Sequence, residues 1–296
     1  MRVTDDERRD HLSDLSQMGS SGRAEAEKPQ TFKLTYLPVP EHVRPFDPGV
    51  ALVLGARGAG KSELFRAAVQ EQLLPAIIRS TREARNLRGI EKTELLTGHP
   101  LGKDFTDAPG MRSFFDSQPL KAEAERDLWF AYLVRTVRKH LGTSPINQSK
   151  MLQLPGAEIG KVVEAFRSLE SEPLLAIDEL DRKLEKQDRW IVISYDELDV
   201  IGGYDWESMI ASIRGLVGFW ATYSRRWTRI RPKIFLRTDL FRRHGQSFGA
   251  DLIKLAANRA EITWSDRNLY TMLVKRIANA SGRLAEYCRQ SRVKFD

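Results

Sequence analysis

Two absences narrow the classes of protein to which this sequence can belong. Its 296 residues include one cysteine, Cys288, which excludes an internal disulfide and a zinc site built from several cysteines. A single cysteine favours a reducing compartment, so we expect a cytoplasmic protein. No apolar run approaches the ~18 residues that a membrane-spanning helix needs. The N-terminus is too charged for a signal peptide. We therefore expect no contact with a membrane.

The positive charge of the sequence is unevenly distributed. The formal net charge is +7, yet residues 205–296 carry 18 Lys and Arg against 8 Asp and Glu, which leaves −3 for residues 1–204. A basic C-terminal third could contact nucleic acid, nucleotide phosphates or an acidic protein. Composition alone leaves these three kinds of partner open.

The strongest motif is the segment 55–62, Gly-Ala-Arg-Gly-Ala-Gly-Lys-Ser, which fits the phosphate-binding pattern G-x-x-x-x-G-K-[ST] without a mismatch. An apolar run at 49–54 precedes it, and apolar residues at helical spacing follow it, so the segment is expected between a buried strand and a helix. Its glycines let backbone N–H groups approach an anion at the positive end of that helix. We expect Lys61 to reach the β- and γ-phosphates of a nucleotide and the Ser62 hydroxyl to bind Mg²⁺.

The sequence Asp-Glu-Leu-Asp occurs twice, at 178–181 and at 196–199, and only one copy can be the acidic end of a Walker B strand. The first copy lies in a charged segment with Pro173 at its start and apolar residues at helical spacing, which predicts an exposed helix. The second copy follows the compact apolar run 190–195, which is typical of a buried parallel strand. We therefore expect Asp196 to hold Mg²⁺ opposite Ser62, and Glu197 to orient and deprotonate the attacking water.

Weaker patterns predict the remaining elements. Residues 98–120 contain several Gly and Pro and are expected to form a long loop or insertion. Strands are predicted at 94–97, 233–236 and 260–264. Helices are predicted at 122–141, 157–169 and 251–258, and after the capping residues Asp205 and Ser265. A basic cluster, Arg225, Arg226, Arg229 and Arg231, precedes the strand at 233–236.

The order of these features resembles the nucleotide-binding core of the AAA+ and STAND ATPases, and within them most resembles the KAP-like bacterial P-loop ATPases. Residues 191–199 and 232–240 carry most of the resemblance, which covers roughly residues 31–280. It implies an α/β fold: a P-loop NTPase with a parallel five-stranded core sheet flanked by helices and a short C-terminal helical lid. It also implies that the P-loop strand adjoins the strand that ends at Arg237, and that the ligands are ATP and Mg²⁺.

The resemblance adds roles for residues outside the two motifs. Arg237 or Thr238 corresponds to a γ-phosphate sensor, and Arg259 to an arginine finger that acts on a neighbouring subunit. No residue is assigned as the sensor arginine of the lid. The predicted catalytic residues are Glu197, Lys61, Arg259 and Arg237. The predicted nucleotide-binding residues are Gly55, Ala56, Arg57, Gly58, Ala59, Gly60, Lys61, Ser62 and Thr238. The predicted Mg²⁺ ligands are Ser62 and Asp196.

We expect three parts: a mobile leader or loosely docked arm at 1–30, an ATPase core at 31–264 and a partial lid at 265–296. The expected function is an ATP-hydrolysing switch in a multi-component bacterial system such as antiviral defence, acting as a homo-oligomer with an effector or sensor protein. One alternative is a nucleic-acid-associated ATPase of the origin-recognition or transposition-regulator type, which the basic C-terminal third favours. The other is a structural scaffold that binds nucleotide with little hydrolysis.

Overall fold

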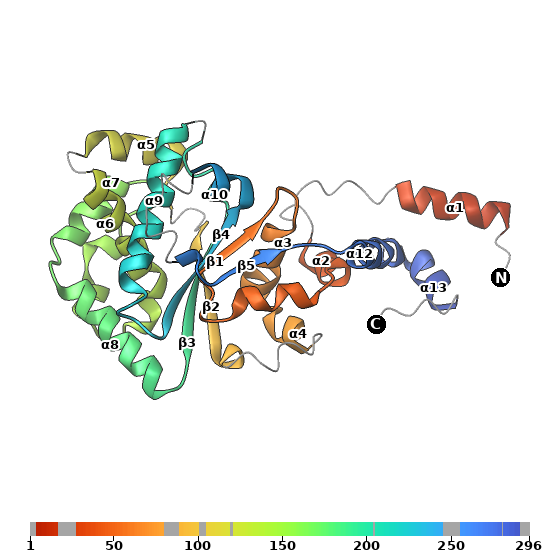
Figure 1. Ribbon diagram of the computed structural model, residues 1–296, viewed down its shortest axis with the longest axis horizontal. Helices are drawn as coiled ribbons and strands as arrows, with labels where there is room; N and C mark the ends of the chain where they lie inside the picture. Colours follow the sequence, from red (N-terminus) through yellow and green to blue (C-terminus); the bar gives the residue numbers. More distant parts are fainter. Residues whose placement is uncertain are drawn as a thin grey trace.

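The computed structural model of the chain describes residues 4–16, 28–79, 89–100, 105–118, 121–203, 205–244, 255–279 and 281–290. Within these ranges a five-stranded sheet carries helices on both faces (Figure 1). The strands are β1 (Leu52–Gly55), β2 (Thr93–His99), β3 (Trp190–Tyr195), β4 (Ile230–Arg237) and β5 (Arg259–Ile262). Every pair is parallel, and the strand order is β2-β3-β4-β1-β5. The expected parallel five-stranded α/β fold is thereby confirmed.

Strand β4 lies between β1 and β3, although it follows both in the sequence. In the register of β1 and β4, Leu52 lies opposite Ile234 and Gly55 opposite Arg237. The strand that carries the 55–62 motif therefore adjoins the strand that ends at Arg237, as the resemblance implied. Because parallel strands end at the same edge of a sheet, the residues that follow β1, β3 and β4 are neighbours in space.

Side chains of the central strands alternate between two apolar clusters, one on each face of the sheet. In β1, Leu52 and Leu54 belong to the larger cluster, whereas Val53 belongs to the smaller one. In β4, Leu236 and Phe235 divide in the same way. This period of two explains why buried parallel strands read as unbroken apolar runs in the sequence.

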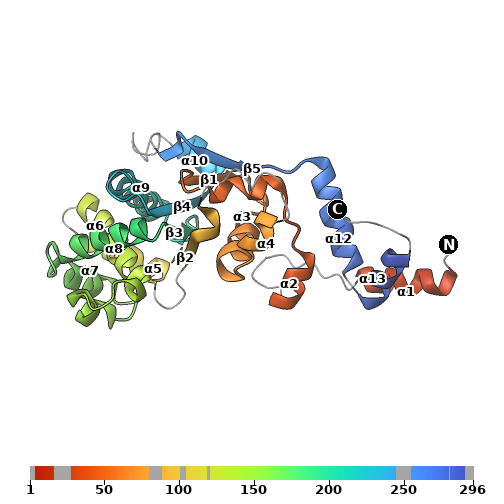
Figure 2. The same cartoon turned by 90° about the horizontal axis from the view of Figure 1, so that it is seen from below.

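The larger cluster is covered by five helices (Figure 2). These are α5 (Ala108–Ser117), α6 (Lys121–Val137), α7 (Ile159–Arg167), α8 (Glu172–Lys186) and α9 (Trp206–Tyr223). The opposite face carries α2 (Pro29–Thr35), α3 (Lys61–Phe65), a π-helical turn at Arg66–Gln70 and α4 (Leu74–Arg79). The side chain of Asp205 accepts a hydrogen bond from the Glu207 N–H and caps α9 as predicted.

Helix α5 lies within the segment that was predicted to be a loop, so that prediction was wrong for residues 108–117. The helix forms because Asp107 caps it by accepting a hydrogen bond from the Gly110 N–H at 2.9 Å. Pro109 occupies the first turn, where proline costs no helical hydrogen bond. Phe114 and Phe115 are buried in the larger cluster and hold the helix against the core.

Helices at both ends of the chain extend to one side of the sheet (Figures 1 and 2). They are α1 (Asp5–Ser16), α12 (Asp266–Ala278) and α13 (Gly282–Gln290). Ser265 caps α12 by accepting a hydrogen bond from the Asn268 N–H, as predicted. Helix α1 contacts α13 through ion pairs of Arg283 with Asp10 and Asp14. Part of the expected leader is therefore a docked helix.

Two further expectations concern helices. The helix predicted over 251–258 lies largely outside the described residues; after α10 (Thr238–His244) the description resumes at Leu255. Within the described ranges, no helix combines the length and apolarity needed to cross a membrane.

Candidate functional site

The loop at 55–62 joins the end of β1 to the first turn of α3. Gly58 and Gly60 have φ angles of 79° and 84°, in the left-handed region that glycine adopts without steric penalty. The ammonium of Lys61 donates hydrogen bonds of 3.0 Å to the carbonyl oxygens of Gly55 and Ala56. Lys61 is thus folded back over its own loop, where an anion bound by the loop could replace these carbonyls as its partner.

Asp196 follows the last residue of β3 and meets Ser62 at the same edge of the sheet. The residue is only 4% exposed, and the Ser62 hydroxyl lies close enough to its carboxylate to affect its pKa. Burial raises the pKa of Asp196, while the Ser62 hydroxyl, the Glu197 backbone N–H and the Lys61 charge act to lower it. The two predicted Mg²⁺ ligands are therefore neighbours.

The second predicted Walker B residue, Glu197, adopts an unusual backbone conformation with φ of 54°. For a residue with a side chain, this left-handed conformation costs roughly 1–2 kcal/mol. The chain turns here, since the Val200 N–H donates to the Glu197 carbonyl at 3.2 Å. The turn buries Leu198, whereas Glu197 stays half-buried at the carboxyl edge of the sheet.

Arg237 ends β4 at this edge and contacts two carboxylates. Its Nε and Nη2 donate to the two oxygens of Asp239 at 3.0 and 2.7 Å, and its Nη1 donates to Asp199 at 3.2 Å. The pKa of Arg237 is raised chiefly by the hydrogen bond to Asp239, and the pKa of Asp239 is lowered by the same bond. Thr238, the other predicted sensor, begins α10, and its buried hydroxyl has no hydrogen-bond partner among the described residues.

The charges at this edge also act on Lys61. Burial lowers the pKa of the Lys61 ammonium most strongly, and the charge of Arg237 lowers it further. The carboxylates of Asp196, Asp199 and Asp239 act in the opposite direction. Asp199 and Asp239 were not predicted as site residues, although each lies within three residues of a predicted one.

Arg259 lies apart from this group. It is the first residue of β5, which begins one position before the strand predicted at 260–264, and it pairs with Leu52 at the start of β1. Gly55, at the other end of β1, pairs with Ile262. Arg259 therefore stands at the opposite edge of the sheet from the 55–62 loop, where it lines a cavity of about 570 Å³ together with Arg44.

Two residues near the C-terminus contact the loop region, and neither was predicted. Trp264 Nε1 donates to the Ala59 carbonyl oxygen at 2.9 Å. Arg276 of α12 forms an ion pair of 2.9 Å with Glu63, in the first turn of α3. These contacts join residues about 200 positions apart, so no local pattern could indicate them.

The first Asp-Glu-Leu-Asp copy lies in α8, as predicted, but two of its carboxylates have a specific structural role. Asp181 accepts hydrogen bonds from three consecutive backbone N–H groups, at 228–230, with distances of 2.9, 2.7 and 3.1 Å. Asp178 pairs with Arg226 and accepts a hydrogen bond from Trp227 Nε1. These contacts of the first copy stabilise the connection between α9 and β4.

The basic cluster before β4 is engaged in similar contacts. Arg226 pairs with Asp178, and Arg229 pairs with Asp188 while its guanidinium lies 3.9 Å from the centre of the Trp190 ring. Arg231 donates to the carbonyl oxygens of residues 224 and 228. Three of the four arginines thus stabilise the connection to β4, which leaves fewer charges for an external phosphate backbone.

Comparison with protein-family models, curated proteins and solved structures finds no match to this chain. The functional argument therefore rests on the residues of the site itself.

Proposed function

We propose that the chain is an ATPase that works as a molecular switch, with 55–62 as its P-loop and Asp196-Glu197 as its Walker B acids. One observation carries the proposal: Ser62 and the buried Asp196 carboxylate are neighbours beside the Lys61 ammonium, which lies over the carbonyl oxygens of its own loop. A hydroxyl, a carboxylate and an ammonium at the end of parallel strands suit a Mg²⁺-bound polyphosphate. The left-handed glycines of the loop favour the same ligand.

The donor set suits Mg²⁺ in particular. Mg²⁺ prefers oxygen ligands and is held by one or two protein groups together with phosphates and water. Ser62 and Asp196 supply two such oxygens. Among the described residues, no group of three or more His, Cys, Asp or Glu side chains could hold a metal ion alone. The remaining ligands would come from the nucleotide and from water.

Each charged residue has a distinct task in the proposed reaction. Lys61 exchanges its carbonyl partners for the β- and γ-phosphates, where its charge offsets the charge of the transferred phosphoryl group. Glu197 accepts a proton from the attacking water. Arg237 and Thr238 contact the γ-phosphate from the end of β4, which lies between the two motif strands. Arg259 acts on the nucleotide of a neighbouring subunit, because it is remote from its own loop.

The wider role that we propose follows from the resemblance to KAP-like ATPases. It comprises a homo-oligomer in the cytoplasm, an effector or sensor protein partner, and a function in a bacterial defence system. Helices α12 and α13 are the proposed lid, and the Arg276 contact with Glu63 links that lid to the first turn after the P-loop. The nucleic-acid alternative loses support from the internal pairing of the basic cluster before β4.

The decisive experiment is ATP binding and turnover by wild type and by Lys61→Ala. Without the ammonium, the β- and γ-phosphates lose their cationic partner from the loop, so we expect binding of Mg·ATP to fall at least tenfold and turnover to be lost. Calorimetric titration measures the binding of Mg·ATP, and phosphate release measures turnover. If Lys61→Ala binds Mg·ATP as tightly as wild type, the P-loop assignment is wrong. Binding without turnover in wild type would favour the scaffold alternative.

A further inference from the structure

The guanidinium of Arg237 is held in place by protein carboxylates. All three of its nitrogens donate hydrogen bonds, two to Asp239 and one to Asp199, at distances between 2.7 and 3.2 Å. Asp239 belongs to the first turn of α10, whereas Asp199 comes from the turn after β3. Carboxylates from two separate elements therefore hold one arginine at the site.

The balance of charge at this edge disfavours a bare polyphosphate. Lys61 and Arg237 supply two positive charges, and Asp196, Asp199 and Asp239 supply three negative ones within electrostatic range of Lys61. A nucleotide that approaches without Mg²⁺ meets an excess of like charge. While Arg237 is paired with Asp199 and Asp239, it offers little net positive charge to a phosphate.

We propose that Asp199 and Asp239 form a latch that holds Arg237 until a γ-phosphate displaces them, so that the position of Arg237 responds to nucleoside triphosphate and not to diphosphate. This inference rests on the proposed function and deepens it. The planar fork of an arginine binds the oxygens of phosphate as readily as those of a carboxylate, so the displacement exchanges similar bonds. A diphosphate has no terminal group at that position and leaves the latch closed. Asp199 and Asp239 are positioning residues here, since they act through Arg237.

The test compares the affinities of the single variants Asp199→Asn and Asp239→Asn for two ligands, both with Mg²⁺: a non-hydrolysable β,γ-imido analogue of ATP, and ADP. Each variant keeps the side-chain shape but weakens the pairing of one carboxylate with Arg237. Half-exposed ion pairs are worth up to about 1 kcal/mol, so we expect the analogue to bind ~3–5-fold more tightly. The affinity for ADP should change less than twofold. Calorimetric titration measures both, and thermal unfolding checks that the variants are folded.

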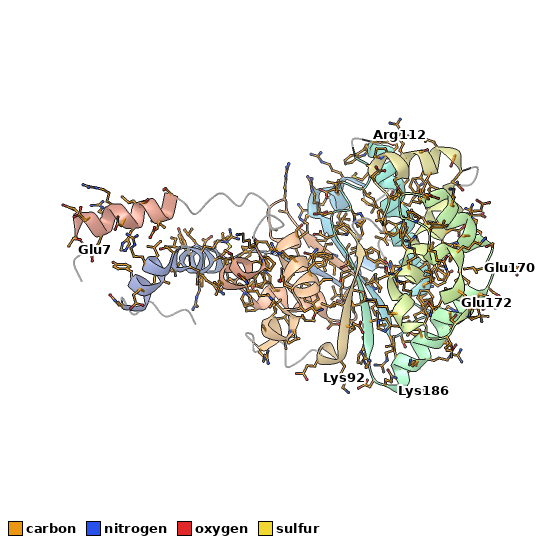
Figure 3. The ribbon with its side chains drawn as sticks, turned by 180° about the vertical axis from the view of Figure 1, so that it is seen from behind. Glu7, Lys92, Arg112, Glu170, Glu172 and Lys186 are labelled. Atoms are coloured by element: carbon orange, nitrogen blue, oxygen red, sulfur yellow. The ribbon has the colours of Figure 1, made fainter. Side chains whose placement is uncertain are left out.

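Asp188→Asn is the matched control. Asp188 also lies between two cations, at 2.6 Å from Lys92 and 3.0 Å from Arg229. It precedes β3, so it is at the edge of the sheet opposite to the site; Figure 3 labels its partner Lys92 there, near Lys186 at the end of α8. The substitution removes the same charge without contact to Arg237, and neither affinity should change.

The latch is overturned if the variants alter both affinities by the same factor, because that result describes a simple charge effect. Unchanged affinities in both variants overturn it as well. The tighter binding of the analogue must also depend on Arg237. If Asp239→Asn still improves analogue binding when Arg237 is replaced by alanine, Asp239 acts by another route and the latch is wrong. Failure of wild type and all variants to bind either nucleotide would refute the proposed function itself, which separates the two inferences.

Discussion

Gly55 lies opposite Arg237 in the parallel register of β1 and β4. This pairing places the start of the phosphate-binding motif beside an arginine that lies 182 positions further along the chain. The acids that follow β3 lie on the other side of β4. Strand order therefore assembles the candidate site from three separate segments.

The two Asp-Glu-Leu-Asp copies provide a matched pair of substitutions. Glu197→Gln should lower the rate of ATP hydrolysis by about 10²–10⁴-fold while ATP stays bound, because the amide keeps the shape of the carboxylate but accepts no proton. Glu179→Gln, on the exposed face of α8, should leave turnover nearly unchanged. Single-turnover hydrolysis and nucleotide retention measure the difference. Reversed effects would mean that the Walker B assignment is wrong.

Asp181 should be important for stability and not for nucleotide binding. The side chain is 7% exposed and satisfies three backbone N–H groups, so Asp181→Ala leaves buried donors without partners. We expect a loss of about 2–4 kcal/mol in the free energy of unfolding, measured by urea denaturation. Glu185→Ala, at an exposed position of the same helix, should change it by less than ~0.5 kcal/mol. Similar losses in both variants would contradict the role of Asp181.

Lys233 should make stability depend on pH. Its ammonium is 0% exposed and donates to the carbonyl oxygens of Asp47 and Val50. Burial lowers the pKa of Lys233 from 10.5 to about 7. The two carbonyl oxygens of Asp47 and Val50 accept hydrogen bonds from the two N–H groups that Lys233 keeps in its neutral form, so the buried neutral amine is fully hydrogen-bonded.

The sign of this dependence follows from proton binding. Between pH 7 and 10.5 the unfolded chain keeps a proton on Lys233 that the folded protein has released, so stability rises with pH, and below pH 7 this gain is lost. One group can contribute at most ~1.4 kcal/mol per pH unit. Denaturation at pH 7 and 9 should show this rise in wild type and a smaller one in Lys233→Met. Equal slopes in the two proteins would contradict the assignment.

Arg259 should act between subunits. Because it stands at the sheet edge opposite its own 55–62 loop, Arg259→Ala should still bind ATP but lose hydrolysis, by up to ~10³–10⁵-fold for an arginine finger. Mixing Arg259→Ala with Glu197→Gln should restore part of the activity, since a mixed interface can combine an intact arginine with an intact base. Full activity of Arg259→Ala, or a rate per subunit that does not depend on protein concentration, would contradict this role.

The sequence by itself determined the features that depend on neighbouring residues. The glycine spacing of 55–62, the apolar run at 190–195 and the cap at Asp205 each specify a local conformation, and each element formed where it was predicted. Even the wrong prediction at 98–120 has a local cause. Pro109 and Gly110 favour a loop by composition, yet both are tolerated in the first turn of a helix.

Only the tertiary structure decided which of these segments meet. The position of β4 between β1 and β3 brings Arg237 to the loop, and the turn after β3 brings Asp199 to Arg237. The roles of Asp181 and Arg276 likewise depend on partners far away in the sequence. Periodicity and turn chemistry are local, whereas these contacts depend on strand order and on how the helices pack over the sheet, which no local pattern encodes.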